Sequence, residues 1–265
     1  MPITWITDCH LDRAGPAAVE DFHSALRERG GNPVIVTGDI SHAGRLVADL
    51  ERIAEAGGGP VWFVLGNHDH YGASIGTLRD AVSELGEANP AIRWLPPAGV
   101  VELGPRQLLV GVDGWADGRH GDPIRTPLVL NDDRLIAELA AQEGRAAKLA
   151  VKQILADADA ARLETLLGRA AERDPETIIV ATHVPPFVEA LKPGSREAHP
   201  HWHPLLVCGA TGAVLHRFAS AHPAIAMTVL AGHSHRGHEA DILPNLTVRV
   251  GEARYGAPRV VRITV

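Results

Sequence analysis

The chain has 265 residues, of which 45% are hydrophobic, and a formal net charge of −7. This composition is that of a globular protein and excludes an intrinsically disordered chain. Non-specific nucleic-acid binding depends on clustered Lys and Arg, so an acidic chain without such a block is not expected to bind nucleic acid. The length suits an α/β protein, and we expect a single domain over residues 1–265.

The sequence shows no targeting or membrane signal. No basic segment followed by an apolar one begins the chain, so no signal peptide is expected. No run reaches the roughly 18 apolar residues of a transmembrane helix, so no membrane partner is expected. The two cysteines, Cys9 and Cys208, form no metal-like or redox-like cluster. We therefore expect a cytoplasmic protein; the sequence does not indicate an oligomeric state.

Strands and helices alternate over the first ninety residues. Apolar runs predict strands at 3–7, 33–37 and 61–65, and helical spacing predicts helices at 16–29, 45–56 and 73–86. The strands are continuously apolar, which indicates a sheet covered on both faces. Right-handed crossovers place the carboxyl ends of such strands at one edge, where ligands collect in α/β proteins.

The remaining elements are predicted as follows. Short hairpin strands are expected at 93–95, 100–103 and 107–112, and an insert at about 115–172 is polar and turn-rich at first and helical from 132. Most of this insert is expected to pack on the sheet rather than to form a lid. A loop at 184–204 and a helix at 205–221 separate further strands at 177–181, 225–230, 246–250 and 259–265.

Five short polar motifs each follow an apolar stretch. They are Asp8-Cys9-His10, Gly38-Asp39, Gly66-Asn67-His68-Asp69, Thr182-His183 and Gly232-His233-Ser234-His235. Any one of them alone is weak, since an isolated Asp-x-His or Gly-Asn-His is usually a surface turn. Together they supply nitrogen and oxygen ligands for two divalent metal ions. Two metals about 3.5–4 Å apart form a centre that hydrolyses phosphate esters.

Local geometry suggests how the motifs present their side chains. Side chains alternate along a strand, so Asp8 and His10 are expected to point to the same metal while Cys9 packs in the core. His233 and His235 repeat this spacing. The glycine before Asp39, like the one before Asn67, is expected to permit a sharp turn.

These five motifs resemble those of the calcineurin-like metallophosphoesterases, and the resemblance spans about residues 3–235. It implies an α/β fold: a four-layer αββα sandwich of two mixed sheets flanked by helices, with a dimetal site at the carboxyl ends of the strands. It also implies two ligand sets, Asp8, His10 and His235 for one metal and Asn67, His183 and His233 for the other, with Asp39 bridging them.

The donor set indicates the cofactors and the chemistry. Nitrogen and oxygen donors favour two divalent ions of Mn, Fe or Zn over thiolate-selected metals. The expected nucleophile is a hydroxide bridging the metals, which attacks phosphorus in line. His68, next to Asn67, is the candidate for phosphate contact and general acid catalysis. Asp69 either orients and charges His68 or caps the helix at 73–86.

Loops over the strand ends are expected to contact the substrate. The candidate substrate-binding residues are Asn67, His68, Arg119 and His120. Two further features have competing interpretations. His199, His201 and His203 resemble an extra metal site, but a polar loop is favoured. Trp115 and Trp202 could stack on a base, although packing is the more common role of tryptophan.

The leading hypothesis is a phosphoesterase for a small soluble phosphodiester, such as a cyclic nucleotide or a nucleotide-like compound; phosphomonoester hydrolysis is the alternative. Gly38-Asp39-Ile40-Ser41-His42-Ala43-Gly44 departs from the Gly-Asp-x-x-Asp-Arg-Gly pattern of the protein serine/threonine phosphatases. A nuclease should have a basic groove, which is not apparent. A non-catalytic scaffold should have lost ligands, yet all five motifs are intact.

Overall fold

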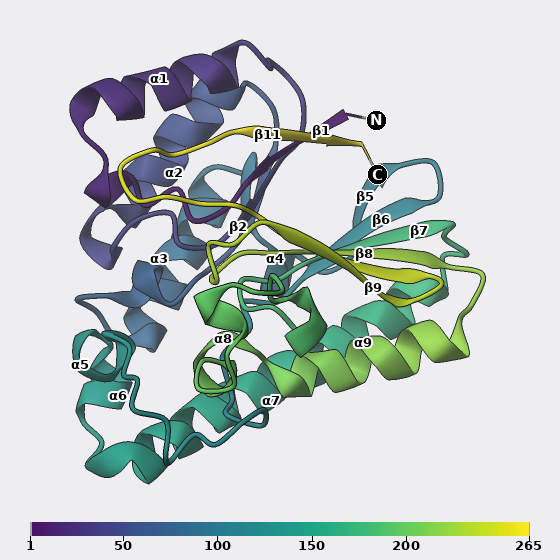
Figure 1. Cartoon of the computed structure of the whole chain (residues 1–265). Coiled ribbons are helices and arrows are strands. Elements are labelled where there is room, and N and C mark those ends of the chain that lie inside the picture. Colours follow the sequence, from purple (N-terminus) through teal and green to yellow (C-terminus); the bar gives the residue numbers. More distant parts are fainter. Residues whose placement is uncertain (1, 265) are drawn as a thin grey trace.

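A computed structural model describes residues 2–264. Two β-sheets lie face to face, and helices cover the outer side of each (Figure 1). The first sheet has the strand order β11-β1-β2-β3-β4 and is parallel except for β11, which pairs antiparallel with β1. Its strands are β1 (Pro2–Ile6), β2 (Val34–Thr37), β3 (Val61–Val64), β4 (Ile92–Trp94) and β11 (Val261–Thr264).

The second sheet has the order β5-β6-β7-β8-β10-β9. Its four central strands are parallel, and the edge strands β5 and β9 pair antiparallel with their neighbours. The strands are β5 (Val101–Gly104), β6 (Gln107–Gly111), β7 (Thr177–Ala181), β8 (Ala226–Ala231), β9 (His238–Leu243) and β10 (Leu246–Val250).

Amphipathic helices form the two outer layers. The first sheet is covered by α1 (Pro16–Arg27), α2 (Ala43–Gly57) and α3 (Ile75–Ala88), and the second by α7 (Gly144–Ala171) and α9 (Gly209–Ala221). In α2, Leu46, Leu50 and Ile53 are buried at helical spacing. The short helices are α4 (Leu95–Ala98), α5 (Asp132–Leu135), α6 (Ala137–Ala140), α8 (His203–Leu206), η1 (Leu11–Arg13), η2 (His68–His70), η3 (Val188–Ala190) and η4 (Arg196–Ala198).

Hydrophobic packing fills the three spaces between the layers. One core, which includes Phe63, lies between the first sheet and its helices. A second joins the sheets through residues such as Ile35 and Ile179, and a third lies between the second sheet and α7 and α9. The central strands are therefore buried on both faces, as their apolar runs indicated. The expected four-layer αββα sandwich is confirmed.

The structure differs from the predicted elements in three places. β4 is not part of a hairpin: it pairs parallel with β3, and Pro96 and Pro97 belong to α4, through which the chain crosses to the second sheet. β9 was missed because its sequence, HEADIL, is an edge strand with weak β propensity. The helix expected at 205–221 is two helices, interrupted at Val207 and Cys208.

The insert divides into two parts with different contacts. The long helix α7 packs on the second sheet, as expected. In contrast, α5 and α6 lie against the loop that follows η2, where the backbone N–H of Gly72 donates to the carbonyl of Leu135 and that of Ala137 to Ala73. This docking brings residues 129–132 beside the polar motifs.

Two further observations concern the cysteines and the helices. Cys9 and Cys208 are both free and buried, and Cys9 packs in the core of the first sheet, as expected. Over residues 2–264, none of the helices combines the length and the apolar character needed to cross a membrane.

Candidate metal centre

Loops from both sheets bring the five motifs together at one edge of the sandwich. Asp8, Asp39 and Asn67 follow β1, β2 and β3, and His183 and His233 follow β7 and β8. Backbone hydrogen bonds link neighbouring loops: the N–H of Asp8 donates to Gly38 (3.1 Å) and the N–H of Gly232 to His183 (2.9 Å). The common edge follows from the parallel arrangement of these strands.

The side chains of these motifs form two groups of candidate ligand atoms, each within 4.8 Å: Asp8, His10, Asp39 and His235 in one, and Asp39, His183 and His233 in the other. Asp39 belongs to both. Its Oδ2 lies 3.6 Å from Nε2 of His10, and its Oδ1 lies 3.3 Å from Nε2 of His183. The two groups contain six of the seven residues that the resemblance assigned to two metals, all except Asn67, and Asp39 is common to both.

The amide of Asn67 is oriented by a residue of the insert. Its Oδ1 lies 3.1 Å from Nε2 of His183, in the second group, while its Nδ2 donates to Oδ1 of Asp132 at 2.7 Å. The hydroxyl of Tyr71 also donates to that Asp132 oxygen, at 2.6 Å. A carboxylate can only accept these bonds, so the amide nitrogen must face Asp132 and the oxygen must face the ligand group.

Hydrogen bonds also set which ring nitrogen of His183 and of His233 is available. Nδ1 of His183 lies 2.9 Å from the carbonyl of Thr37 and therefore donates to it, which leaves Nε2 facing Asp39 as the nitrogen that would bind a metal in place of its proton. Nε2 of His233 donates to the carbonyl of Leu205 at 2.8 Å, which leaves its Nδ1 free to bind a metal. Carbonyl acceptors of this kind orient metal-binding histidines in many proteins.

The charges of the centre fit divalent cations. Burial opposes ionisation of both partners of the Asp39–His183 pair, but their attraction prevails: the pKa of Asp39 lies well below its usual range, and that of His183 rises to about 10. The buried carboxylates thus attract positive charge. Nε2 of His10 and Nε2 of His235 are only 3.1 Å apart, a spacing at which two lone pairs need a proton or a cation between them. The residues present therefore fit metal ions.

Backbone strain is concentrated at the same residues. Within residues 2–264, seven residues other than glycine have positive φ, and five of them are candidate ligands: Asp8, His10, Asp39, His233 and His235. Strain of this kind persists where surrounding structure enforces it, often at functional sites. The strand-alternation argument was therefore wrong: β1 ends at Ile6 and β8 at Ala231, so both Asp-x-His and His-x-His pairs lie in left-handed loop segments.

Two glycines allow these loops to approach one another. A Cβ atom at Gly38, where φ is 82°, would lie 2.7 Å from Nδ1 of His183 and 2.6 Å from the backbone nitrogen of Gly66. A Cβ atom at Gly66 would overlap the carboxylate of Asp39. The glycines are thus required by contact between loops, in addition to the turns that the sequence indicated.

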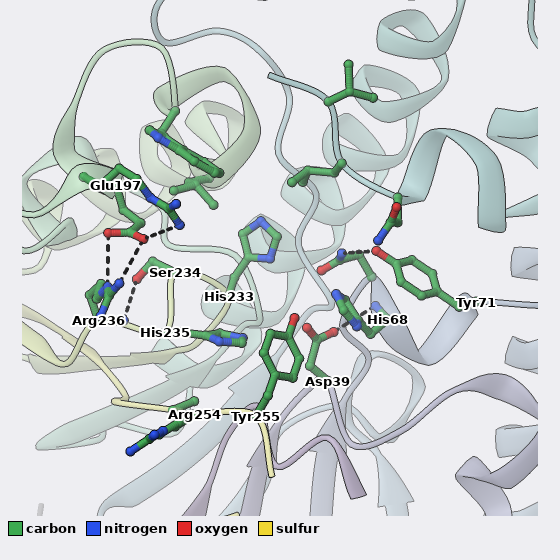
Figure 2. A pocket seen from close by; sticks show the side chains of 18 residues that line it. Asp39, His68, Tyr71, Glu197, His233, Ser234, His235, Arg236, Arg254 and Tyr255 are labelled. Atoms are coloured by element: carbon green, nitrogen blue, oxygen red, sulfur yellow. Dashed lines mark hydrogen bonds and ion pairs between the residues drawn. The ribbon is translucent and has the colours of Figure 1, made fainter. Parts of the chain in front are cut away.

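His68 lies beside the centre and faces the pocket (Figure 2). Its ring stacks on Tyr71 with a centroid distance of 4.3 Å, and it lies 4.6 Å from the ring of His10. Its backbone N–H donates to Oδ1 of Asp39 at 2.9 Å. These contacts hold the ring in place. The ring is not part of either group of ligand atoms, so it stays available to contact a substrate in the pocket.

Asp69 has a different position from the one expected. Its carboxylate is buried and accepts four backbone N–H bonds, from Asp39, Ile40, Ser41 and Gly66. The side chain therefore braces two ligand loops and does not line the pocket beside His68. The alternative capping role is wrong, because Ser74 caps α3 through its bond to Thr77.

Arg119 and His120 are not brought to the pocket. Arg119 forms ion pairs with Asp117 and Asp157, both at 2.7 Å, which tie its loop to α7. The expectation that these residues contact substrate is therefore not supported by their positions. Trp115 is buried in a core cluster.

The histidine-rich loop follows the simpler interpretation. The N–H of His201 donates to Nδ1 of His199, and His203 bonds to the carbonyl of Ala198. Among the described residues, these three histidines form no group of ligand atoms close enough to share an ion. Trp202 of the same loop, however, lines the pocket.

The pocket has a volume of about 580 Å³ and opens onto the candidate ligands. Most of its outer wall was missed by sequence reasoning. That wall includes Val129, Leu130, Asn131, Arg196, Glu197, Arg236, Arg254 and Tyr255. These residues belong to loops and short helices without a recognisable motif, so nothing local in the sequence marked them.

Asp113, also missed, joins the ends of two strands from different sheets. Its Oδ1 accepts from the N–H of Leu65 (2.9 Å) and from the indole of Trp94 (2.8 Å), and its Oδ2 pairs with Arg79 (3.1 Å). Its backbone carbonyl accepts from the N–H of His183 at 2.8 Å. Asp113 thereby links the loop that carries Asn67 to the one that carries His183.

Comparison with known proteins agrees with the fold. The model of the calcineurin-like phosphoesterase family matches residues 1–237, and the chain belongs to this family. Comparison with curated protein sequences finds no match.

Solved structures show the same fold. A phosphopantetheinyl hydrolase from Mycobacterium tuberculosis aligns over 98% of this chain and 95% of its own, with a TM-score of 0.64 and 16% identity. A dimetal phosphatase from Danio rerio aligns over 95% of this chain and 87% of its own, with a TM-score of 0.59 and 13% identity. At these identities the comparison concerns the fold alone.

Replacement of Asp113 tests its role in joining the sheets. Asp113→Ala leaves the buried N–H of Leu65 and the partly buried indole N–H of Trp94 without an acceptor, and leaves Arg79 with only its longer contact to Asp159 (4.0 Å), so we expect a loss of about 3 kcal/mol in the free energy of unfolding. Asp113→Asn keeps one acceptor oxygen and should lose less. Urea denaturation measures both, and an alanine variant as stable as wild type would contradict the role.

Proposed function

We propose that the protein is a metal-dependent phosphodiesterase for small soluble substrates, such as a cyclic nucleotide or a nucleotide-like compound. The observation that carries this proposal is the pair of ligand-atom groups that share Asp39 beside a pocket of about 580 Å³. A pocket of this size accommodates a nucleotide-sized molecule. The net charge of −7 and the limited size of the pocket favour a small molecule over a nucleic acid.

The proposed ligands are Asp8, His10 and His235 for one ion and Asn67, His183 and His233 for the other, with Asp39 shared. Two divalent ions of Mn, Fe or Zn held there would lower the pKa of water toward neutrality and polarise the phosphoryl oxygens. The protein contributes fixed ligand orientations, a buried setting and the space for in-line attack.

His68 is the proposed contact for the phosphoryl group and the proposed donor of a proton to the leaving oxygen. It lines the pocket, lies next to Asn67, and is held by Tyr71 without being used as a ligand. Asp69 is better assigned a positioning role, since all its hydrogen bonds go to the backbone of the ligand loops. The general acid would therefore act without a carboxylate partner from Asp69.

A diester requires room for a second substituent on phosphorus. The pocket provides it beyond the candidate ligands, where Trp202, Leu206 and Tyr255 line the wall. A monoester has a single substituent and would fill less of this space than a diester. This space favours the diesterase over the phosphomonoesterase, which remains the alternative.

Initial rates on bis(p-nitrophenyl) phosphate and p-nitrophenyl phosphate test the proposal directly. With Mn²⁺ we expect turnover that prefers the diester and that chelation abolishes. A preference for the monoester would establish the alternative activity. A protein that binds no metal would contradict the proposal altogether.

Replacement of His68 separates general acid catalysis from metal binding. For His68→Gln we expect kcat to fall by about 10²–10⁴-fold on an alkyl ester, whose leaving group needs a proton, and by much less on a p-nitrophenyl ester. Metal content, measured by mass spectrometry of the desalted protein, should stay at the wild-type value. An equal fall for both leaving groups would contradict the role of proton donor.

Replacement of Asp132 tests whether the insert orients a metal ligand. Asp132→Asn can donate as well as accept, so the amide of Asn67 would no longer be held with its oxygen toward His183. We expect the metal content to fall from two ions toward one. Asp133→Asn, in the same helix but paired with Lys152, is the matched control. Two tightly retained ions in the Asp132 variant would refute the orienting role.

A further inference from the structure

The wall of the pocket farthest from His68 and Tyr71 is rich in arginine (Figure 2). Three guanidinium groups line it, and they come from three separate segments. Arg196 begins η4, Arg236 follows the histidine motif after β8, and Arg254 lies in the loop between β10 and β11. The fold thus gathers positive charge at a place where the sequence shows no basic cluster.

The charges in this wall do not cancel. Among the described residues that line this wall, Glu197 is the one acidic side chain, and it pairs with Arg196 at 3.2 Å and with Arg236 at 3.1 Å. Three guanidinium groups and one carboxylate leave a surplus of two positive charges. In a chain with a net charge of −7, this local surplus indicates recognition of an anion.

Two of the arginines are held in place before any ligand binds. Arg236 contacts Glu197 through both Nε and Nη2, and Glu197 is itself buried. Arg196 lies over the ring of Trp202, with its Cζ 4.9 Å from the ring centroid. Ordering of these long side chains reduces the entropy that binding would otherwise cost.

The guanidinium of Arg254 differs in having no hydrogen bond or ion pair within residues 2–264, where only the backbone carbonyl of this residue is bonded, to the N–H of Ala257. It is exposed and lines the pocket beside Tyr255. A guanidinium presents several donors in one plane and binds phosphate or carboxylate through two parallel hydrogen bonds. Arg254 is therefore available to contact a ligand directly.

Aromatic and apolar side chains connect the arginines to the candidate metal ligands. The ring of Tyr255 lies 4.5 Å from the ring of His10 and 5.0 Å from that of His235, and Trp202 lines the same cavity. A molecule with its phosphodiester at the ligands could place a planar or apolar part against these rings and an anionic group against the arginines.

We infer that Arg196, Arg236 and Arg254 form a second anion subsite, and that the preferred substrates carry a second anionic group, phosphate or carboxylate, beside the phosphodiester that is cleaved. This inference rests on the proposed function, because it places the cleaved phosphate at the candidate metal ligands. Arg254 and Tyr255 lie beyond residues 1–237, the part matched by the family model, so the subsite is built partly from this chain's own C-terminal segment.

The test compares three esters that release p-nitrophenolate: thymidine 5′-(p-nitrophenyl phosphate), its 3′-phosphate and its 3′-O-succinyl derivative. In the wild-type holoenzyme we expect the KM of one or both anionic derivatives to be lower by about tenfold, as for one charge-assisted contact. The two derivatives show whether the subsite takes phosphate, carboxylate or either. Arg254→Ala and Arg236→Ala should bring the KM ratio, defined as the KM of the parent ester divided by that of an anionic derivative, toward one.

Arg259→Ala is the matched control, because Arg259 lies in the same C-terminal segment, pairs with Glu252 and does not line the pocket. It should keep the wild-type KM ratio. Equal KM values for the three esters in the wild type would overturn the subsite. A preference for the anionic esters that persists in both Arg254→Ala and Arg236→Ala would also overturn it. So would a preference that Arg259→Ala removes as well. Absence of metal-dependent turnover on every ester would instead overturn the proposed function.

Discussion

The rest of the site depends on the contacts between the carboxylate of Asp39 and the histidines around it. Its two oxygens face histidines from opposite sheets, His10 at 3.6 Å and His183 at 3.3 Å. To reach this position, its backbone adopts a positive φ, and glycines at 38 and 66 let the neighbouring loops come within contact distance. A buried carboxylate is costly without positive charge, so the surrounding imidazoles and the candidate metal ions are parts of one electrostatic unit.

Three further buried carboxylates hold this unit in shape without entering either group of ligand atoms. Asp69 accepts four backbone N–H groups of the ligand loops, Asp113 ties the end of β3 to the end of β7, and Asp132 fixes the amide of Asn67. Each uses its acceptors to satisfy buried donors that the loops would otherwise leave unpaired. Among the candidate ligands with positive φ, Asp39 is held directly by one of these bonds, from its backbone N–H to Asp69.

The two sides of the pocket have different origins. The ligand side comes from strand ends, where the sheets impose positions on the side chains. The rest of the lining comes from the insert, the 184–204 loop, Arg236 and the C-terminal loop, which lie far apart in the sequence. Such loops can vary without disturbing the layers beneath them, so in the proposed function the metal ligands and most of the substrate contacts belong to separate parts of the fold.

The sequence by itself determined the fold class, the family and the candidate ligands, because apolar strands followed by Asp, Asn or His are a local pattern. Parallel strands then bring their ends to one edge whatever the loops do. Only the tertiary structure decided the roles of Asp132 and Tyr255, the bracing position of Asp69 and the absence of Arg119 from the pocket. These depend on the paths of loops and on which buried donors need an acceptor. Such contacts join residues far apart in the chain, and they cannot be predicted from periodicity or motif spacing, which are local patterns.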